Sequence, residues 1–272
     1  MRYDPVKGLI GRMVSKSAVL RKIFYALLDI LLLRTWHVKK AVRQFAAEKT
    51  DAENILDAGS GFGQYSWWMS GLNKNWNILG IDIKEEQIDD CNSFIGKTGA
   101  AGRVSFRLAD LTTFTENEKY DLILSVDVME HINDDRAVFG NFSRALRKNG
   151  WLIISTPSDK GGSDVHSEDD HSFIAEHVRD GYGIEEIREK LQSAGFGNII
   201  SRYTYGRPGK LSWKLSMKYP VIMLNFSFIL ALILPFYYIL AMPFALILNY
   251  FDLRLNHGEG TGLLVIAKKQ NN

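Results

Sequence analysis

Short apolar runs alternate with helical stretches through the middle of the chain. The runs are rich in Ile, Leu and Val at consecutive positions, which is typical of strands buried on both faces of a sheet. Seven strands are expected, at residues 55–59, 77–83, 104–110, 120–126, 150–156, 198–205 and 262–268. Because helical stretches separate most of them, the pattern predicts an α/β fold with a doubly wound parallel sheet.

A glycine-rich turn follows the first of these strands. It reads Asp57-Ala-Gly59-Ser-Gly61-Phe-Gly63 and leads into a predicted helix. Glycines let a backbone turn sharply and approach a ligand closely, and a helix N-terminus offers free N–H groups. Dinucleotide-binding enzymes use a similar turn, but their pattern is G-x-G-x-x-G, and here the third glycine comes one position too early.

Acidic residues mark the ends of the next three strands. Asp82 ends the second, Asp110 ends the third, and Asp127 begins the segment Asp-Val-Met-Glu130-His131 after the fourth. The carboxyl ends of parallel strands meet at one edge of a sheet, so these side chains are expected to gather there. A carboxylate at the position of Asp82 can accept both hydroxyls of a ribose.

Together, these motifs resemble the class I S-adenosylmethionine-dependent methyltransferases, over about residues 51–201 and the last strand. The resemblance implies a Rossmann-like, mostly parallel sheet of seven strands, in which the seventh runs antiparallel between the fifth and sixth. It implies that the glycine turn holds the methionine end of S-adenosylmethionine, the end of strand two the ribose, and the end of strand three the adenine. The expected cofactor-binding residues are Asp57, Gly59, Gly61, Gly63, Asp82, Ile83, Ala109, Asp110 and Asp127.

Two histidines are candidate general bases for a hydroxyl acceptor. His131 follows the fourth strand near the expected methyl group, where a packing role is the alternative. His171 lies in a polar loop after the fifth strand, where a solvated loop is the alternative. This loop also holds Asp164, His166, Asp170 and His177, but without a fixed ligand spacing, so no metal site is predicted. The residues Asp127 to His131 are also similar to a segment of the ubiquinone O-methyltransferases in which a divalent ion has been proposed, which keeps a metal as an alternative.

Positive charge is concentrated at both ends of the chain. Residues 1–50 carry 11 Lys/Arg against 3 Asp/Glu, and residues 201–272 carry 8 against 2. Because these residues mix with aliphatic runs, they indicate an anionic membrane surface as partner and no nucleic acid, although solvated basic ends are the alternative. Residues 23–33 predict an apolar helix, either in the membrane interface or packed on the core. The single cysteine, Cys91, excludes an internal disulfide and fits a reducing cytoplasm.

The 33 residues from Tyr219 to Phe251 carry no charge. They lie between the sixth and seventh strands, which must share one sheet, so both ends of the insertion lie on one side of any membrane. Two crossings need about 40 residues. Pro235 is expected to divide the run into helices of about 21 and 22 Å, too short for a hydrocarbon core of about 30 Å. The prediction is a monotopic anchor, with a cap over the active site or a dimer interface as the alternatives.

The chain is therefore expected to have three parts, which are a basic helical extension (1–50), a methyltransferase domain (51–205 with 258–272) and a membrane-associating helical insertion (206–257). The predicted function is methylation, favouring O-methylation, of a lipophilic acceptor such as a quinone precursor, aryl polyene or lipid, at the cytoplasmic face of the inner membrane. The alternatives are a membrane-tethered scaffold without turnover, and an enzyme for a soluble acceptor. A homodimer is compatible with any of these.

Overall fold

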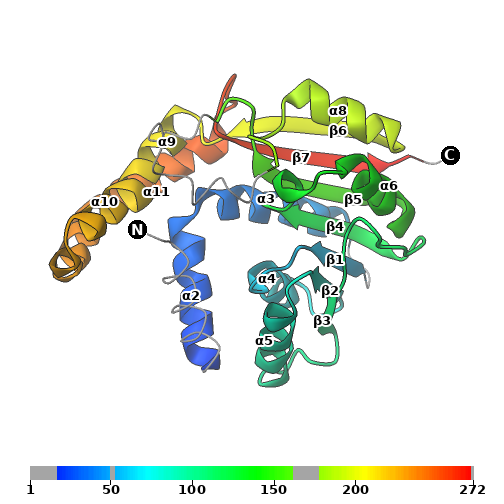
Figure 1. Cartoon of the computed structure of the whole chain (residues 1–272), viewed down its shortest axis with the longest axis horizontal. Helices are drawn as coiled ribbons and strands as arrows, with labels where there is room; N and C mark the ends of the chain where they lie inside the picture. The colour runs from blue at the N-terminus through cyan, green and yellow to red at the C-terminus, as the bar shows by residue number, and fades with distance from the viewer. Residues whose placement is uncertain (1–16, 50–52, 162–177, 271–272) are drawn as a thin grey trace.

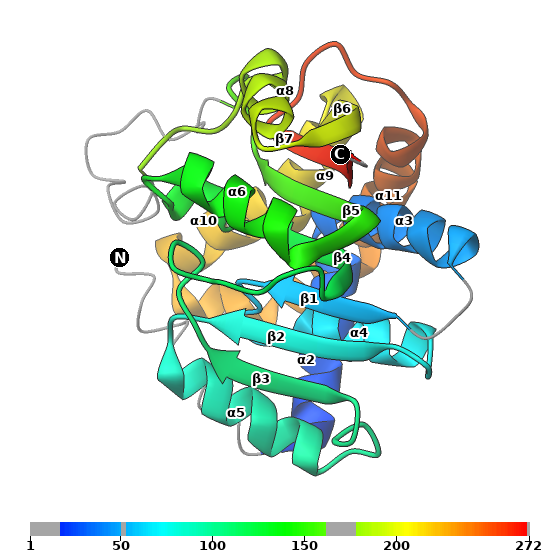
Figure 2. The same ribbon diagram turned by 90° about the vertical axis from the view of Figure 1, so that its right-hand side faces the viewer.

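The computed structural model describes residues 17–49, 53–161 and 178–270, and their fold is built on one seven-stranded sheet. The strand order is β3-β2-β1-β4-β5-β7-β6, and β7 runs antiparallel to both of its neighbours (Figures 1 and 2). The strands are β1 Asn54–Ala58, β2 Asn77–Asp82, β3 Val104–Leu108, β4 Tyr120–Val126, β5 Leu146–Pro157, β6 Phe196–Thr204 and β7 Gly262–Lys269. The predicted α/β class, the mostly parallel sheet and the place of the seventh strand are confirmed.

Helices cover both faces of this sheet and enclose two apolar cores. One core lies beneath α3 (Leu33–Glu48), α4 (Gln64–Leu72) and α5 (Glu85–Gly96). The other lies beneath α6 (Asp135–Ala145) and α8 (Ile184–Ser193). Because β1 and β4 are buried along almost their whole length, the segments that follow them are held at a fixed edge of the sheet.

The N-terminal helix α2 (Ala18–Leu31) has two different faces. One face packs on the domain through the buried Arg21 and Tyr25. The opposite face leaves large apolar side chains in solvent with an exposed fraction of 42 to 66%, and these are Val19, Ile23, Leu27 and Ile30. They recur every three or four residues and form one stripe. The helix therefore packs on the core, and it also presents an apolar surface, while its place in a membrane interface stays a prediction.

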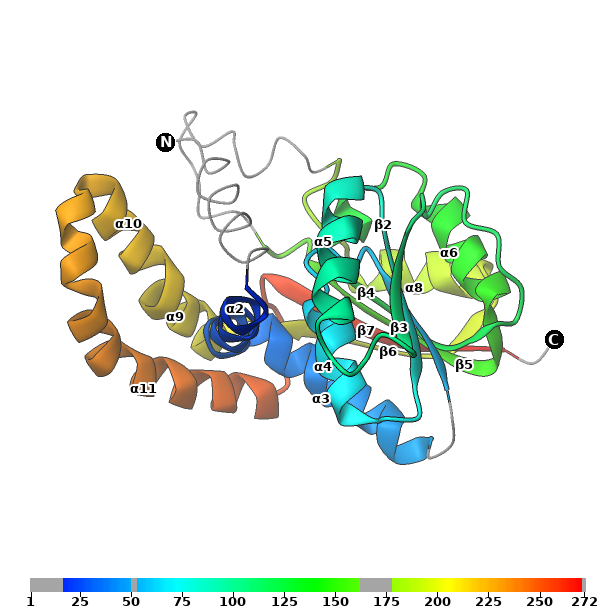
Figure 3. The same cartoon turned by 90° about the horizontal axis from the view of Figure 1, so that it is seen from below.

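The insertion between β6 and β7 is a helical hairpin that projects from the domain (Figures 1 and 3). Its first arm contains α9 (Arg207–Trp213), a π-helix (Lys214–Lys218) and α10 (Tyr219–Phe226). A 3₁₀ turn, Phe228–Leu232, leads into the second arm, α11 (Leu234–Arg254). Figure 3 shows α11 bent part-way along, as a proline inside the helix, Pro243, would cause.

The hairpin corrects one prediction. The chain reverses before Pro235, which occupies the first turn of α11, where a missing N–H costs nothing. The second arm then continues for 21 residues, about 31 Å, so the expectation that both arms are too short to cross a membrane is wrong for this arm. Among the described residues, α11 is the one helix whose length and composition would allow a crossing. Since β7 pairs with β5 and β6, both ends of the hairpin nevertheless lie on the same side of any membrane.

Candidate active site

The glycine-rich turn between β1 and α4 is tight at two positions and open at one. Gly59, Gly61 and Gly63 have φ values of +80°, +49° and +73°, which favour glycine. A Cβ atom at Gly59 would come 2.2 Å from Val128 Cγ2, and one at Gly63 would come 2.9 Å from Phe106 Cζ. A Cβ atom at Gly61 would meet nothing within 4 Å. The turn thus packs closely on the domain on both flanks and leaves its middle open to a ligand.

Asp57 lies beneath this turn. Its carboxylate is buried and accepts hydrogen bonds from the backbone N–H of Ser66 at 3.1 Å and from the Ser66 hydroxyl at 2.6 Å. Burial raises the pKa of Asp57 to about 6, although the bonds from Ser66 act in the opposite direction. In the structure Asp57 fixes the start of α4 against β1, and its predicted contact with the methionine end of the cofactor stays a prediction.

The acidic residues after β2 and β3 lie at the same edge. Asp82 accepts the N–H of Gly61 at 2.9 Å and that of Lys84 at 3.0 Å, so its carboxylate adjoins the open part of the turn. Asp110 is exposed and accepts both the N–H and the hydroxyl of Thr112 at 2.8 Å. Two other predicted cofactor residues also face solvent at least in part, namely Ile83 and Ala109. A row of carboxylates beside the open space at Gly61 suits a ligand that carries both a cationic sulfonium and ribose hydroxyls.

Asp127 begins the segment after β4 and has a left-handed backbone, with φ of +52°. Its carboxylate forms an ion pair with Arg34 of α3, and about a third of each side chain is exposed. The backbone N–H of Arg34 in turn donates to the hydroxyl of Tyr205, at the end of β6, at 3.0 Å. Sequence reasoning placed Asp127 at this edge but missed Arg34, because nothing in the residues around Arg34 indicates a contact with β4.

Arg21 and Tyr25 support the glycine turn from α2. The buried guanidinium of Arg21 donates to the carbonyl oxygens of Phe62 at 3.0 Å and Asp90 at 2.9 Å. The hydroxyl of Tyr25 donates to the same Phe62 carbonyl and accepts from Arg21 Nε at 2.8 Å. Phe62 lies between Gly61 and Gly63, so α2 fixes the open part of the turn. The only signal in the sequence is an arginine followed four residues later by a tyrosine on one face of an amphipathic helix.

Of the two candidate bases, only His131 lies within the described residues. His131 is exposed and ends a short 3₁₀ helix, Met129–His131, directly after the strained Asp127. The preceding Glu130 is buried and accepts a hydrogen bond from the Thr156 hydroxyl at 3.0 Å. His171, like the acidic and histidine residues around it, lies outside the described residues. Within the described part of the chain, no group of three potential metal ligands is present.

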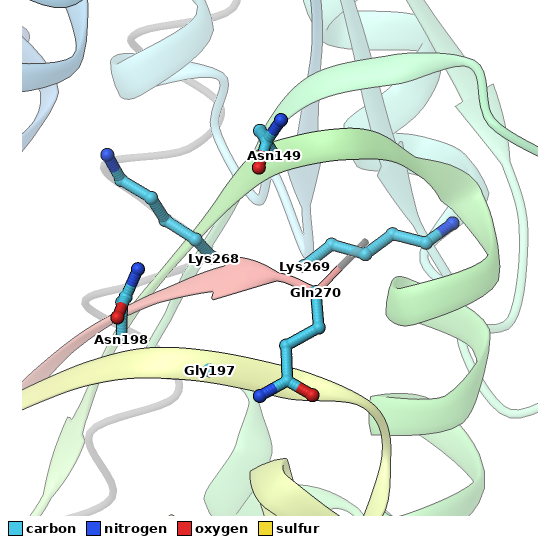
Figure 4. Close-up of a pocket in the computed structure, with 6 residues that line it drawn as sticks. All are labelled: Asn149, Gly197, Asn198, Lys268, Lys269 and Gln270. Carbon is cyan, nitrogen blue, oxygen red and sulfur yellow. The ribbon is translucent and has the colours of Figure 1, made fainter. Parts of the chain in front are cut away.

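A hollow of about 250 Å³ lies at the opposite end of the sheet and is lined by Asn149, Gly197, Asn198, Lys268, Lys269 and Gln270 (Figure 4). Figure 4 shows the two lysine side chains extending to opposite sides of β7. Lys268 pairs with Glu48 at 2.9 Å, and Lys269 donates to the Leu146 carbonyl at 2.8 Å. The lysines therefore support the fold at this end, far from the glycine turn.

Comparison with known proteins agrees with the geometry of the carboxyl edge. A family described as "Methyltransferase domain" matches residues 49–198, which is more than half of the chain and includes the glycine turn, Asp57, Asp82, Asp110 and Asp127. The chain belongs to this family. It is a class I S-adenosylmethionine-dependent methyltransferase, and its cofactor is S-adenosylmethionine.

The similar proteins differ in what they methylate. A wheat phosphoethanolamine N-methyltransferase is 30% identical over 151 residues, which is 55% of this chain and 29% of the wheat protein. A ubiquinone biosynthesis O-methyltransferase of Pelagibacter ubique is 28% identical over 102 residues, 38% of this chain and 41% of that protein. Among solved structures, a Haemonchus contortus phosphoethanolamine N-methyltransferase in complex with S-adenosylmethionine has a TM-score of 0.60 at 20% identity, with 87% of this chain and 53% of that chain covered. The last comparison supports the fold alone.

Proposed function

We propose that this methyltransferase is a monotopic membrane enzyme of the cytoplasmic face of the inner membrane, and that it methylates a lipophilic acceptor. The observation that carries the proposal is the distribution of side chains in the hairpin. Its two arms meet through small and polar residues, and its large apolar residues point outward. In a hairpin surrounded by water the opposite arrangement is favoured, because burial of apolar surface drives association there.

The interior of the hairpin contains small and polar side chains. The buried positions of the first arm include Gly209, Ser212 and Ser216, and those of the second include Ala241, Ala245, Asn249 and Asp252. The hydroxyl of Ser212 donates to the Ala245 carbonyl at 3.0 Å. Small residues that allow close approach, with hydrogen bonds between the helices, are typical of helix pairs in lipid.

Two tyrosine hydroxyls of α11 donate to backbone carbonyls of the π-helix. Tyr237 donates to the Leu215 carbonyl at 2.7 Å, and Tyr238 donates to the Ser216 carbonyl at 2.9 Å. A π-helix disturbs the regular bonding of an α-helix, and backbone carbonyls without partners are costly in lipid. The two tyrosines therefore make the first arm compatible with an apolar environment.

The exterior of the hairpin is apolar around its tip and along α11. The exposed fraction is 86% for Phe226, 74% for Ile229 and 76% for Leu232 at the tip. Along α11 it is 69% for Phe236 and 72% for Leu240, and the stripe continues through Phe244, Ile247, Phe251 and Leu255. An apolar surface of this length on one projecting element fits insertion into lipid.

Three lysines limit how deep the first arm inserts. Lys210, Lys214 and Lys218 follow one another at intervals of four residues on the first arm. Beyond Lys218, α10 has only eight residues, or about 12 Å, which is less than one leaflet of a hydrocarbon core about 30 Å thick. With the lysines among the lipid headgroups, α10 stays within one leaflet.

The acceptor is inferred from this arrangement and from the relatives. The sheet edge that carries the glycine turn and the carboxylates is called the cofactor edge. Because it lies on the same domain as a lipid-inserted hairpin, an acceptor drawn from the membrane is favoured. The named relatives include an N-methyltransferase for phosphoethanolamine and an O-methyltransferase of ubiquinone biosynthesis. We favour O-methylation of a quinone precursor, aryl polyene or lipid, with His131 taking the hydroxyl proton. The protein's other task is alignment, since the sulfonium is already activated.

Vesicle flotation tests the membrane part of the proposal. The full-length protein is expected to float with vesicles, and Phe226→Glu with Leu232→Glu is expected to abolish flotation while the affinity for S-adenosylmethionine stays unchanged. The matched control is Ile200→Glu, which adds a charge at an apolar side chain that is 64% exposed on β6. Flotation of the tip variant would contradict the proposal. If the wild-type protein is a dimer that does not float, and the tip variant is a monomer, the hairpin is a dimer interface.

Methyl transfer itself is tested with radiolabelled S-adenosylmethionine and a membrane lipid extract. The wild-type protein is expected to transfer label to the organic phase, and His131→Ala is expected to lower the rate by about 10² or more. His131→Ala should bind S-adenosylmethionine as the wild type does. An unchanged rate would remove His131 as the base. The absence of labelled product with membrane extract, together with labelled product from a soluble extract, would assign a soluble acceptor.

A further inference from the structure

We infer that Lys40, Arg202 and Arg254 form a binding site for the phosphate of an anionic phospholipid, at the junction where the hairpin leaves the domain. This inference rests on the proposed membrane association and names the lipid class that the protein prefers. The three cations come from α3, β6 and the end of α11, and are brought together only by the fold.

Side-chain contacts place each cation at this junction. The ammonium of Lys40 donates to the Leu253 carbonyl in the last turn of α11 at 3.0 Å. A guanidinium nitrogen of Arg202 lies 3.3 Å from Nδ1 of His37, which is one helical turn before Lys40. The guanidinium of Arg254, the residue after Leu253, lies 4.9 Å from the ring centre of Tyr250.

One carboxylate, that of the buried Asp252, acts on the cluster through its charge on Arg202. Among the described residues, no ion pair is present between any of these three cations and an acidic side chain. The nearby Asp252 is fully buried, and its carboxylate already accepts from His37 at 2.9 Å, from the backbone N–H of Gly209 at 3.0 Å and from that of Tyr205 at 3.2 Å. Burial, and then the positive charges of Arg202 and Arg254, lower the pKa of Lys40, so the three cations repel one another. An anion bound among them would relieve this repulsion.

The surroundings of the cluster indicate that the anion carries acyl chains. Tyr250, Phe251 and Leu255 surround Arg254 along the chain and are 47, 50 and 51% exposed. They continue the apolar stripe of α11 that begins at Phe236. A phosphate bound by the cations thus has an apolar surface beside it, as the headgroup of a phospholipid requires. The positive charge of both chain ends fits an anionic rather than a zwitterionic lipid.

Sedimentation with two kinds of vesicle tests the site. The neutral vesicles contain phosphatidylcholine alone, and the anionic vesicles contain about a third phosphatidylglycerol. The double variant Lys40→Gln/Arg254→Gln is expected to bind the anionic vesicles about 30-fold more weakly than the wild type, or about fivefold for each cation. Its binding to neutral vesicles should be unchanged, because the apolar stripe remains. The charge-conserving variant Lys40→Arg/Arg254→Lys should keep most of the preference, and an unchanged S-adenosylmethionine affinity shows that each variant is folded.

The matched control is Lys74→Gln/Lys148→Gln, which removes two exposed lysines of the domain outside the hairpin and the cluster. Its affinity for the anionic vesicles is expected to fall by less than about twofold. An equal loss in both double variants would mean that only net charge matters and would overturn the site. Binding of both vesicle types by the wild type with no effect of Lys40→Gln/Arg254→Gln overturns the site but leaves the membrane proposal intact. Failure of the wild type to bind either vesicle overturns both. Saturable binding of inorganic phosphate without any lipid preference would assign the cluster to a soluble anion and contradict the inference.

Discussion

Arg21→Ala should weaken both the fold and cofactor binding, because this buried side chain connects α2 to the glycine turn. The guanidinium is 2% exposed and donates to the Phe62 and Asp90 carbonyls, and it also stacks 5.1 Å from the ring centre of Phe94. Its removal leaves the Asp90 carbonyl without that donor and opens space among aromatic rings. A hydrogen bond from a charged group contributes about 1.5–3 kcal/mol, and the lost packing adds to this, so we expect a loss of about 3–5 kcal/mol in the free energy of unfolding.

Cofactor affinity reports on the turn separately from stability. With Phe62 held by Tyr25 alone, the segment between Gly61 and Gly63 spends less time in the binding geometry, and the apparent dissociation constant rises by the same factor. We expect about a tenfold weaker affinity for S-adenosylmethionine by calorimetry, and the stability loss by urea unfolding followed by circular dichroism. Lys22→Ala is the matched control, since Lys22 is exposed and lies over the ring of Trp67; it should change stability by no more than about 0.5 kcal/mol. A stability loss below about 1 kcal/mol, or an unchanged affinity, would refute the role of Arg21.

Three further predictions concern the turn and the hairpin. The pKa of Asp57 is raised by burial to about 6 in the folded state, so the native protein holds a proton that the unfolded chain has lost, and stability falls as the pH rises from about 4 to 6. Asp57→Asn should remove about 2 kcal/mol of this decline between pH 4.5 and 7, measured by comparing urea unfolding curves of the two proteins at these two pH values. Gly59→Ala should destabilise the protein by more than about 2 kcal/mol because of the clash with Val128. The control Gly71→Ala, in open space on α4, should stabilise it by up to about 1 kcal/mol. Equal effects of the two substitutions in thermal melts would contradict the packing argument. Asp252→Ala leaves the donors around the carboxylate unpaired and should cost about 3 kcal/mol, and it should also increase proteolysis at the base of the hairpin; resistance equal to wild type would show that the hairpin is held by other contacts.

The sheet could be predicted from the sequence because its signals are local. Each strand is a short apolar run, and the turn after β1 needs glycine at Gly59 and Gly63 for both conformation and space. The point at which the hairpin reverses was harder to predict, since a proline such as Pro235 is compatible both with a break between two helices and with the first turn of a helix. The better signal was Ser227, a small polar residue in an apolar run, whose hydroxyl accepts the N–H of Ile229 at the start of the 3₁₀ turn.

The supporting contacts of the site could not be predicted, because they join residues that are far apart in the chain. Arg21 reaches Phe62, the N–H of Arg34 reaches Tyr205 over 171 positions, and His37 of α3 reaches Asp252 over 215. An arginine or histidine within a helix carries no sequence signal that names its distant partner. The catalytic prediction for His171 also remains a prediction, since this residue lies outside the described part of the chain.

The contacts of Asp252 connect the hairpin to the cofactor edge. Burial lowers the pKa of His37, and Nδ1 of this residue faces Arg202, so the neutral ring donates from Nε2 to Asp252. Tyr205 donates its backbone N–H to the same carboxylate at 3.2 Å, and its hydroxyl accepts from Arg34, the partner of Asp127. Separating α11 from α3 would take the His37 donor from this buried carboxylate and break the bond from Lys40 to the Leu253 carbonyl, so these contacts oppose movement of the hairpin relative to α3. The depth at which the hairpin sits in the proposed membrane therefore also sets the height of the cofactor edge above the lipid, where a lipophilic acceptor must reach the methyl group.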